Sequence, residues 1–255
     1  MTAIPESFSS SHADPSVRGF LHRPDSPSGD GLVLTHGAGG NAKMGLLVAL
    51  ADAFAGAGFT VLRCDMPFRQ ARPFGPPRPG DAARDRAGLA NAVAAMRELV
   101  PGRVFLGGQS DGGRQASMLL AEQQTPKSLT TEDAGLHRET ATEESKPAKA
   151  YSFDGNPVNG LLLLSYPLHP PARPEQLRTQ HLPELHVPTL FVEGTKDPFA
   201  TIEEIEGARK LIPAQTALLP VEGAGHDLGF AGKKKREELP AAVLAKFREF
   251  FDLRW

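Results

Sequence analysis

Residues 104–113 read VFLGGQSDGG, an apolar run that leads into a serine among small and polar residues. The pattern predicts a strand over residues 103–107 and a helix over residues 112–123. A serine on a tight strand-to-helix turn, beside glycines that avoid a clash between a Cβ and the adjacent backbone, is typical of a nucleophile elbow. A plain turn is the alternative, but the flanking strand and helix favour the elbow and make Ser110 a candidate nucleophile.

On both sides of this motif, short apolar runs alternate with longer amphipathic segments. This alternation predicts βα units and a mostly parallel, doubly wound sheet flanked by helices. The predicted strands cover residues 17–22, 31–35, 59–64, 103–107, 159–165, 189–194 and 216–221. The predicted helices cover residues 44–57, 81–99, 112–123, 201–211 and 237–251.

A polar stretch at about residues 122–157 interrupts the pattern. It is rich in Thr, Glu, Lys, Ser and Pro and has few large apolar side chains, so it cannot bury enough surface to offset the entropy of ordering. We predict a flexible insertion, with a linker between two domains as the alternative. Because the βα alternation resumes in phase afterwards, we expect a single domain over residues 1–255.

Two further residues complete a set that a reactive serine requires. A serine hydroxyl needs a base that accepts its proton and an acid that orients the base. Asp197 follows the predicted strand 189–194, and His226 lies in a glycine-lined loop after the next strand. Taken singly, Asp197 could cap a helix and His226 could lie on the surface. Their order along the chain favours a catalytic triad of Ser110, His226 and Asp197.

The loop that follows the predicted strand 31–35 reads HGAGG over residues 36–40. Its glycines let backbone amides approach a ligand closely, and acyl transfer needs such donors for the developing oxyanion. We predict the amides of Ala38 and Asp111 as the oxyanion hole. A phosphate-binding loop is the alternative, but the spacing and the lysine of a P-loop are absent. We expect His36 to form a local hydrogen bond that shapes the turn.

Loops that follow strands lie at the catalytic edge of such a sheet. Residues 166–186 follow a strand, so we expect them to overhang the site as a flap without forming a large cap domain. The predicted substrate contacts are Gly37, Gly39, Tyr166 and His169.

The loop over residues 65–80 also follows a strand, and it carries Arg69, Arg72 and Arg78. These arginines could bind an anionic group of the substrate. The alternative, which we favour, is that they are solvated on a rigid loop.

Taken together, these motifs resemble the α/β-hydrolase family and, more narrowly, its KANSL/Tex-type branch, which is related to the dienelactone hydrolases. The resemblance spans roughly residues 31–251 without the insertion. It implies a core sheet of about eight strands and serine hydrolase geometry. The residues that carry it are the loop 36–40, Ser110 in its elbow, the run 166–171, Asp197 and His226.

One residue departs from this resemblance. Asp111 follows the nucleophile where an uncharged residue, often Met, is expected. A carboxylate beside the oxyanion site would oppose negative charge there unless it points away.

We therefore expect a serine hydrolase that acts on an ester or related acyl bond through an acyl-enzyme, with dienelactone-type and peptidase activities left open. The alternative is a noncatalytic interaction module that keeps the fold. The resemblance motivates this alternative, because eukaryotic members of the KANSL/Tex-type branch include a subunit of a chromatin complex, and so does Asp111. The intact serine, aspartate and histidine argue against it.

The bulk composition limits the partners of the chain. A formal net charge of −2 provides no broad basic field, so we expect a small-molecule substrate and neither a nucleic-acid nor a membrane partner. Residues 1–16 lack the features of a secretory signal, and we expect a cytoplasmic protein. The single cysteine, Cys64, excludes an intramolecular disulfide, and we predict neither a metal nor a cofactor.

Overall fold

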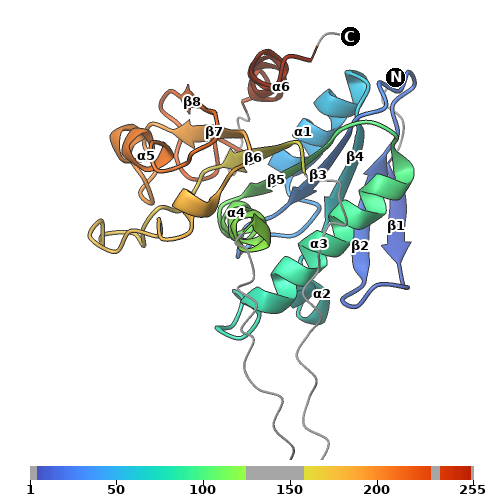
Figure 1. The fold of residues 1–255 in the computed structure, drawn as a ribbon, viewed down its shortest axis with the longest axis horizontal. Helices are drawn as coiled ribbons and strands as arrows, with labels where there is room; N and C mark the ends of the chain where they lie inside the picture. Colours follow the sequence, from blue (N-terminus) through green and yellow to red (C-terminus); the bar gives the residue numbers. More distant parts are fainter. Residues whose placement is uncertain (1–4, 125–157, 231–235, 254–255) are drawn as a thin grey trace, which may run out of the picture.

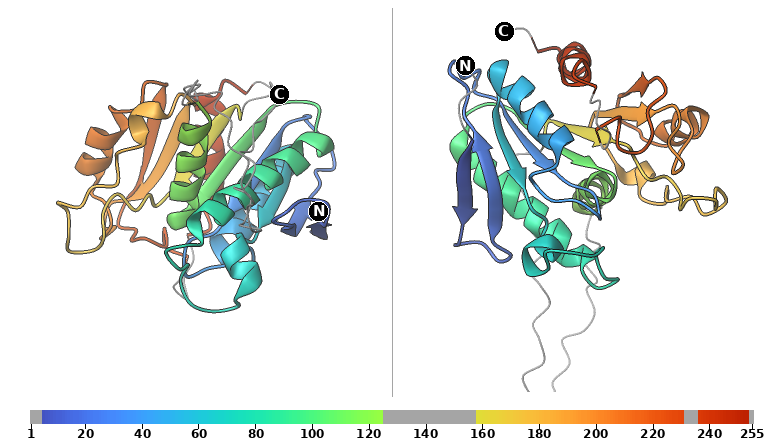
Figure 2. Two further views of the ribbon diagram at one scale, coloured as in Figure 1. Left: turned by 60° about the horizontal axis from the view of Figure 1, so that its bottom comes forward. Right: turned by 180° about the vertical axis from the view of Figure 1, so that it is seen from behind.

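The computed structural model describes residues 5–124, 158–230 and 236–253. They form one eight-stranded sheet with helices on both faces (Figure 1). The strand order is β1-β2-β4-β3-β5-β6-β7-β8; the strands from β4 onward in this order pair in parallel, and β1 and β2 add an antiparallel edge. The predicted fold class is confirmed. Two further views show the same continuous, twisted sheet (Figure 2).

All seven predicted strands and all five predicted helices are present, with ends that differ by at most two residues. The strands are β1 (Glu6–Ser10), β2 (Val17–His22), β3 (Gly31–Thr35), β4 (Thr60–Cys64), β5 (Val104–Gln109), β6 (Gly160–Leu164), β7 (Thr189–Gly194) and β8 (Thr216–Val221). The helices are α1 (Gly45–Gly56), α2 (Pro67–Ala71), α3 (Ala82–Leu99), α4 (Asp111–Gln124), α5 (Ile202–Arg209) and α6 (Leu239–Phe250), with a 3-10 turn η1 (Leu182–Glu184).

The sequence pattern misses β1, α2 and η1. β1 is a mostly exposed edge strand with three serines among its five residues, so it lacks the apolar run that marks the other strands. α2 and η1 span five and three residues, too few for a helical repeat of apolar side chains.

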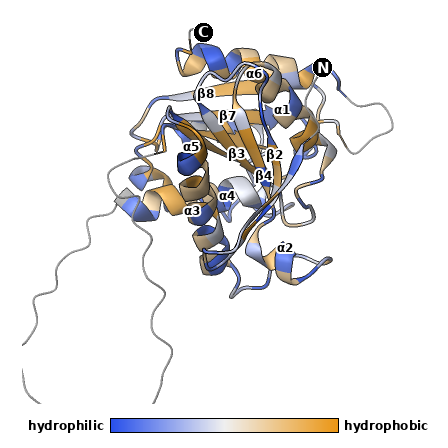
Figure 3. Ribbon diagram, turned by 90° about the vertical axis from the view of Figure 1, so that its right-hand side faces the viewer, coloured by the Kyte–Doolittle hydropathy of each residue, from blue (hydrophilic) through white to orange (hydrophobic). Residues whose placement is uncertain are grey.

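Every residue of the central strands β3, β5 and β6 is buried. This explains their continuous apolar sequence, because helices cover both faces of the sheet. Apolar side chains of α3, α4 and α5 form the core on one face, and those of α1 and α6 form the core on the other. Coloured by hydropathy, the strands are mostly apolar between helices that carry polar outer faces (Figure 3).

The core under α6 is aromatic. Phe247 contacts Phe54 of α1 and Phe105 of β5, with ring centroids 5.0 and 4.9 Å apart in edge-to-face geometry. Leu239 and Val243 of the same helix are also buried against this face. The apolar stripe in the sequence thus docks α6 on the sheet, as its spacing predicts.

The parallel strands place the candidate residues at one edge of the sheet. β3 lies between β4 and β5, so the connections after β3 and β5 lead to helices on opposite faces, α1 and α4. A crevice for a ligand is typical of such a switch point, at the carboxyl ends of the strands. The candidate catalytic residues follow these strands: the loop 36–40 follows β3, Ser110 follows β5, Asp197 follows β7 and His226 follows β8.

The predicted insertion lies almost entirely outside the described residues, so its flexibility and the single-domain organisation stay predictions. Helix α4 continues to Gln124, which makes residues 122–124 helical. The end of α4 and Val158, which precedes β6, flank the segment. Both lie toward the edge of the sheet opposite Ser110, since α4 runs away from that residue and β6 runs toward it.

A capping box fixes the start of α5. The amide of Glu204 donates to Thr201 Oγ1 over 3.2 Å, and the Thr201 amide donates to Glu204 Oε2 over 2.8 Å. The variant Thr201→Ala is expected to lower the free energy of unfolding by about 1 kcal/mol, since one orphan amide loses its acceptor. Urea denaturation measures the loss. Thr201→Ser keeps the hydroxyl as a control, and an equal loss in both variants would contradict the capping role.

Candidate active site

Ser110 lies between the last residue of β5 and the first residue of α4. Its φ of 52° is in the left-handed region, which is strained for a residue with a side chain. The Ser110 amide donates to the Leu164 carbonyl over 2.8 Å and anchors the turn to β6. A Cβ added at Gly108 would lie 2.5 Å from the carbonyl carbon of Gly112, so the tight turn requires glycine there. The local structure is that of a nucleophile elbow.

Three side chains from three loops form one hydrogen-bonded chain. His226 Nε2 lies 2.7 Å from Ser110 Oγ, and His226 Nδ1 lies 2.7 Å from Asp197 Oδ2. The Asp197 side chain is fully buried, whereas 24% of the His226 side chain is exposed. Because a carboxylate only accepts, Nδ1 carries the ring proton and Nε2 is left to accept the serine proton. The arrangement suits a nucleophile, its base and the acid that orients the base.

Phe199 and Gln109, which the sequence analysis did not predict as site residues, hold Asp197 and His226 in place. The Phe199 amide donates to Asp197 Oδ1 over 2.8 Å, and the Phe199 ring packs on the His226 imidazole with centroids 4.1 Å apart. Gln109 Nε2 contacts the His226 carbonyl oxygen over 3.4 Å. The sequence Asp-Pro-Phe carries a signal for the first contact, because an aspartate often accepts from the amide two residues on. No local pattern reveals the ring contact.

The loop 36–40 packs against the elbow with backbone contacts. A Cβ added at Gly37 would lie 3.0 Å from the Ser110 Cβ, and one added at Gly112 would collide with the His36 carbonyl oxygen. A Cβ at Gly39 would have no other atom within 4 Å among the described residues. Gly37 therefore lies against the serine, and Gly39 faces open space.

The two amides expected to form the oxyanion hole belong to these adjoining segments. Between described residues, no hydrogen bond is found that the Ala38 amide donates. The Asp111 amide belongs to the first turn of α4, where amides have no acceptor within the helix. Both donors are thus uncommitted, on segments that contact each other next to Ser110.

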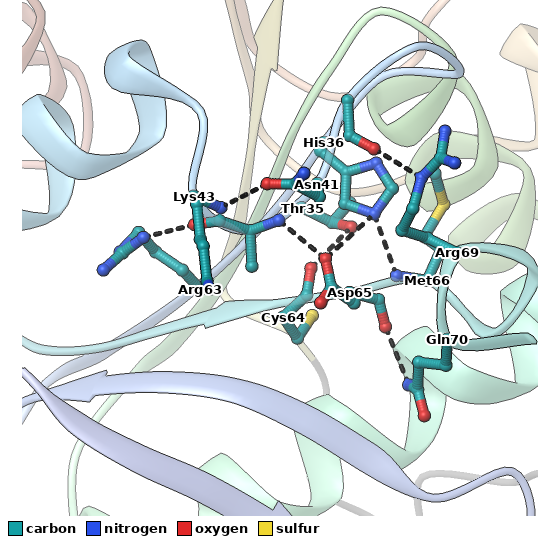
Figure 4. Close-up of polar contacts among 12 residues, drawn as sticks. Thr35, His36, Asn41, Lys43, Arg63, Cys64, Asp65, Met66, Arg69 and Gln70 are labelled. Atoms are coloured by element: carbon teal, nitrogen blue, oxygen red, sulfur yellow. Dashed lines mark hydrogen bonds and ion pairs between the residues drawn. The ribbon is translucent and has the colours of Figure 1, made fainter. Parts of the chain in front are cut away.

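His36 is fully buried and shapes the start of this loop (Figure 4). Its Nδ1 pairs with the Gly37 carbonyl oxygen at 2.8 Å, and its Nε2 accepts from the Met66 amide at 3.1 Å. Burial lowers the pKa of His36, which keeps the ring neutral as these two bonds require. Asp65 supports the other end of the loop by accepting from the Ala42 amide over 2.6 Å. The predicted local role of His36 is confirmed.

Arg69 contradicts both interpretations of the arginine loop, whereas Arg78 is exposed, as the favoured alternative expects. The Arg69 side chain is buried, so it is not solvated, and it donates to the carbonyls of Gly40 over 2.7 Å, Ala38 over 3.0 Å and Gly75 over 2.9 Å. Arg72 forms an ion pair with Asp81. Neither contact leaves a free cation for a substrate anion, and Arg69 instead fixes the loop 36–40 from behind.

The carboxylate of Asp111 lies along α4. Its Oδ1 accepts from Gln115 Nε2 over 3.4 Å, and its Oδ2 is buried without a partner among the described residues. Burial and the neighbouring Arg114 lower the pKa of Arg178, and the negative charge of Asp111 opposes this. The charge that the sequence places next to the nucleophile thus acts on Arg178, although no ion pair joins Asp111 to a cation among the described residues.

Tyr166 and His169 are committed to internal contacts. The Tyr166 side chain is buried and its hydroxyl lies 3.2 Å from His181 Nε2, which also pairs with Ser117 Oγ at 2.8 Å. Burial raises the pKa of Tyr166 to about 12. His169 is buried with its Nε2 3.2 Å from Glu204 Oε2. These contacts hold the loop 166–186 onto α4 and α5, and neither ring is presented to a ligand.

No group of three or more His, Cys, Asp or Glu side chains within residues 5–124, 158–230 and 236–253 is arranged to hold a metal ion. Among the helices in these ranges, none combines the length and the apolar character needed to span a bilayer. Cys64 is buried in the core, as predicted, and burial raises the pKa of its thiol to about 12.

Comparison with known proteins agrees with this fold. The family profile of the alpha/beta hydrolase domain matches residues 29–249, and the chain belongs to this family. A serine hydrolase without a lid from Xanthomonas campestris superposes with a TM-score of 0.67 at 14% identity, covering 98% of this chain and 96% of that one. A dienelactone hydrolase from Anabaena variabilis superposes with a TM-score of 0.64 at 18% identity, covering 97% of each chain.

A third structure, the protein Est1E from Butyrivibrio proteoclasticus, has a TM-score of 0.64 at 14% identity and covers 98% of this chain and 100% of that one. At these identities the structures establish the shared fold. The chain is therefore an α/β-hydrolase-fold protein with an eight-stranded sheet, and the fold and its serine hydrolase neighbours support a hydrolase.

Proposed function

We propose that the protein is a serine hydrolase that cleaves an ester or related acyl bond of a small molecule. One observation carries the proposal: His226 lies 2.7 Å from both Ser110 Oγ and Asp197 Oδ2. A serine, a histidine and an aspartate that are hydrogen-bonded in this order make it easier to remove the serine proton during attack on a carbonyl. A noncatalytic module has no need for a strained serine held in this geometry.

In the proposed reaction, Ser110 Oγ attacks the acyl carbon while its proton passes to His226 Nε2. The amides of Ala38 and Asp111 donate to the oxyanion, and Asp197 stabilises the imidazolium. His226 then gives the proton to the leaving alcohol, which leaves an acyl group on the serine. Water repeats the sequence and releases the acid.

The structural neighbours indicate the class of substrate. A dienelactone hydrolase and serine hydrolases are among the proteins with this fold, which favours a carboxylic ester. We also propose that the chain lies in the KANSL/Tex-type branch and acts in the cytoplasm, without a nucleic-acid partner. A noncatalytic interaction module is the second candidate, and Asp111 next to the serine is the feature that favours it.

A fluorophosphonate probe tests the proposal directly. We expect the wild-type protein to be labelled and Ser110→Ala to be unlabelled, because the probe reacts with an activated serine. Ser117→Ala is the matched control: Ser117 also pairs with a histidine at 2.8 Å but is fully buried, so its loss should leave labelling intact. Absent labelling of the wild type would favour the noncatalytic module.

A further inference from the structure

Glu193 lies near the end of β7 and places a carboxyl group in the interior of the protein. It is fully buried, which is rare for a glutamate without a cationic partner. Its Oε2 accepts from the Tyr166 amide over 2.8 Å, whereas its Oε1 accepts no hydrogen bond from the described residues. An oxygen left in this state costs free energy unless a proton converts it into a donor.

The group next to it is the acid of the proposed triad. Directly after Glu193 the chain turns back, and the Asp197 amide donates to the Gly194 carbonyl over 3.1 Å. Both carboxyl side chains are fully buried, and no Lys, Arg or His of the described residues forms an ion pair with Glu193. Two adjacent buried carboxyls without a cation between them cannot both be ionised.

The donors around the pair decide which carboxyl keeps the proton. Both oxygens of Asp197 already accept, one from His226 and the other from the Phe199 amide, so its charged form is satisfied. Glu193 accepts from the Tyr166 amide over 2.8 Å, and the Gly194 amide adds only a weaker stabilisation of its charged form. Burial raises the pKa of Glu193 to about 10, and a hydrogen bond to Asp197 and the negative charge of Asp197 add to the rise. Geometry and electrostatics both assign the proton to Glu193.

We propose that Glu193 is a positioning residue whose carboxylic acid donates a hydrogen bond to the Asp197 carboxylate and so fixes the group that orients His226. This role rests on the proposed function. Asp197 is then held by three donors: the His226 ring, the Phe199 amide and the Glu193 hydroxyl. A neutral Glu193 also adds no second negative charge next to the Asp197 carboxylate.

The kinetic test compares two substitutions on a p-nitrophenyl ester. Glu193→Met fills a similar volume but has no donor, and kcat is expected to fall about 10²-fold with little change in KM, since Asp197 is misplaced. Glu193→Gln retains a donor and an acceptor and is expected to recover most of that loss. In the pH profile of kcat/KM, the midpoint of the acidic limb should be the same for Glu193→Gln and the wild type, because the substitution removes no charge.

The opposite outcomes would overturn the proposal. If Glu193 were ionised, the Gln variant would remove a negative charge and shift the acid-limb midpoint downward. Equal loss of rate in both variants would likewise reject a role for the donated proton.

A spectroscopic measurement decides the protonation state without turnover. The infrared difference between the wild type and Glu193→Gln at neutral pH should contain the carbonyl stretch of a protonated carboxylic acid. The same band should remain in the Ser110→Ala background. A missing band rejects the proposal even if the enzyme is active, whereas a band in a protein that fluorophosphonate does not label rejects the proposed function and leaves the Glu193 hydrogen bond standing.

Discussion

The variant His226→Ala is expected to lower kcat on an ester substrate by about 10⁶-fold. His226 is the only described side chain that contacts Ser110 Oγ in a hydrogen bond, so no other base can accept the serine proton. The amides around the oxyanion would still provide a residual rate above that of water. Asp197→Asn is expected to cost about 10⁴-fold, because it favours the wrong tautomer of the imidazole.

His181→Ala provides the control for this experiment. His181 also pairs with a serine, but it lies in the internal contact with Ser117 and Tyr166, away from the elbow. We expect it to lower stability and to change kcat far less than the loss of His226 does. Initial rates on p-nitrophenyl acetate, with circular dichroism to check folding, make the comparison. Similar rates for His226→Ala and the wild type would remove His226 as the base.

The sequence predicts the parts of the fold and site that depend on local pattern. Continuous apolar runs mark the central strands because both faces of a parallel sheet are covered. Ser110, Asp197 and His226 each follow a parallel strand, β5, β7 and β8 respectively, and parallel strands bring their carboxyl ends to one edge. For this reason the order of Ser110, Asp197 and His226 along the chain is enough to predict a site in which the side chains now lie within hydrogen-bond distance.

The remaining features depend on contacts between distant segments, which local pattern does not contain. Tyr166 follows a strand, and the sequence pattern alone predicts a ligand contact there, yet the 3-10 turn η1 and α4 enclose its ring. Glu193 reads as a polar residue at a strand end, and only the fold places it beside a second buried carboxyl. Whether a polar side chain is buried therefore depends on the fold, and the local sequence pattern does not predict it.

Arg69→Met is expected to lower kcat about 10²-fold while KM changes little. The guanidinium bridges the carbonyls of Ala38, Gly40 and Gly75, and no other described side chain donates a hydrogen bond to the first two. Without it the peptide groups of the loop 36–40 can rotate, and the Ala38 amide, the proposed oxyanion donor, no longer points toward the oxyanion. Removing one such donor typically costs 10²–10³ in kcat, about the loss expected when the donor is misplaced.

Two further variants separate this role from simple loss of charge or stability. Arg69→Lys keeps the charge but presents one compact ammonium instead of a planar fork, so it should recover little of the rate. Arg72→Met removes a neighbouring arginine whose partner is Asp81, and it should leave kcat nearly unchanged. Full activity in Arg69→Lys would mean that the charge alone is needed. An unchanged kcat in a folded Arg69→Met protein would mean that the loop holds its shape without this support, and the oxyanion donors would then have to be sought elsewhere than in Ala38.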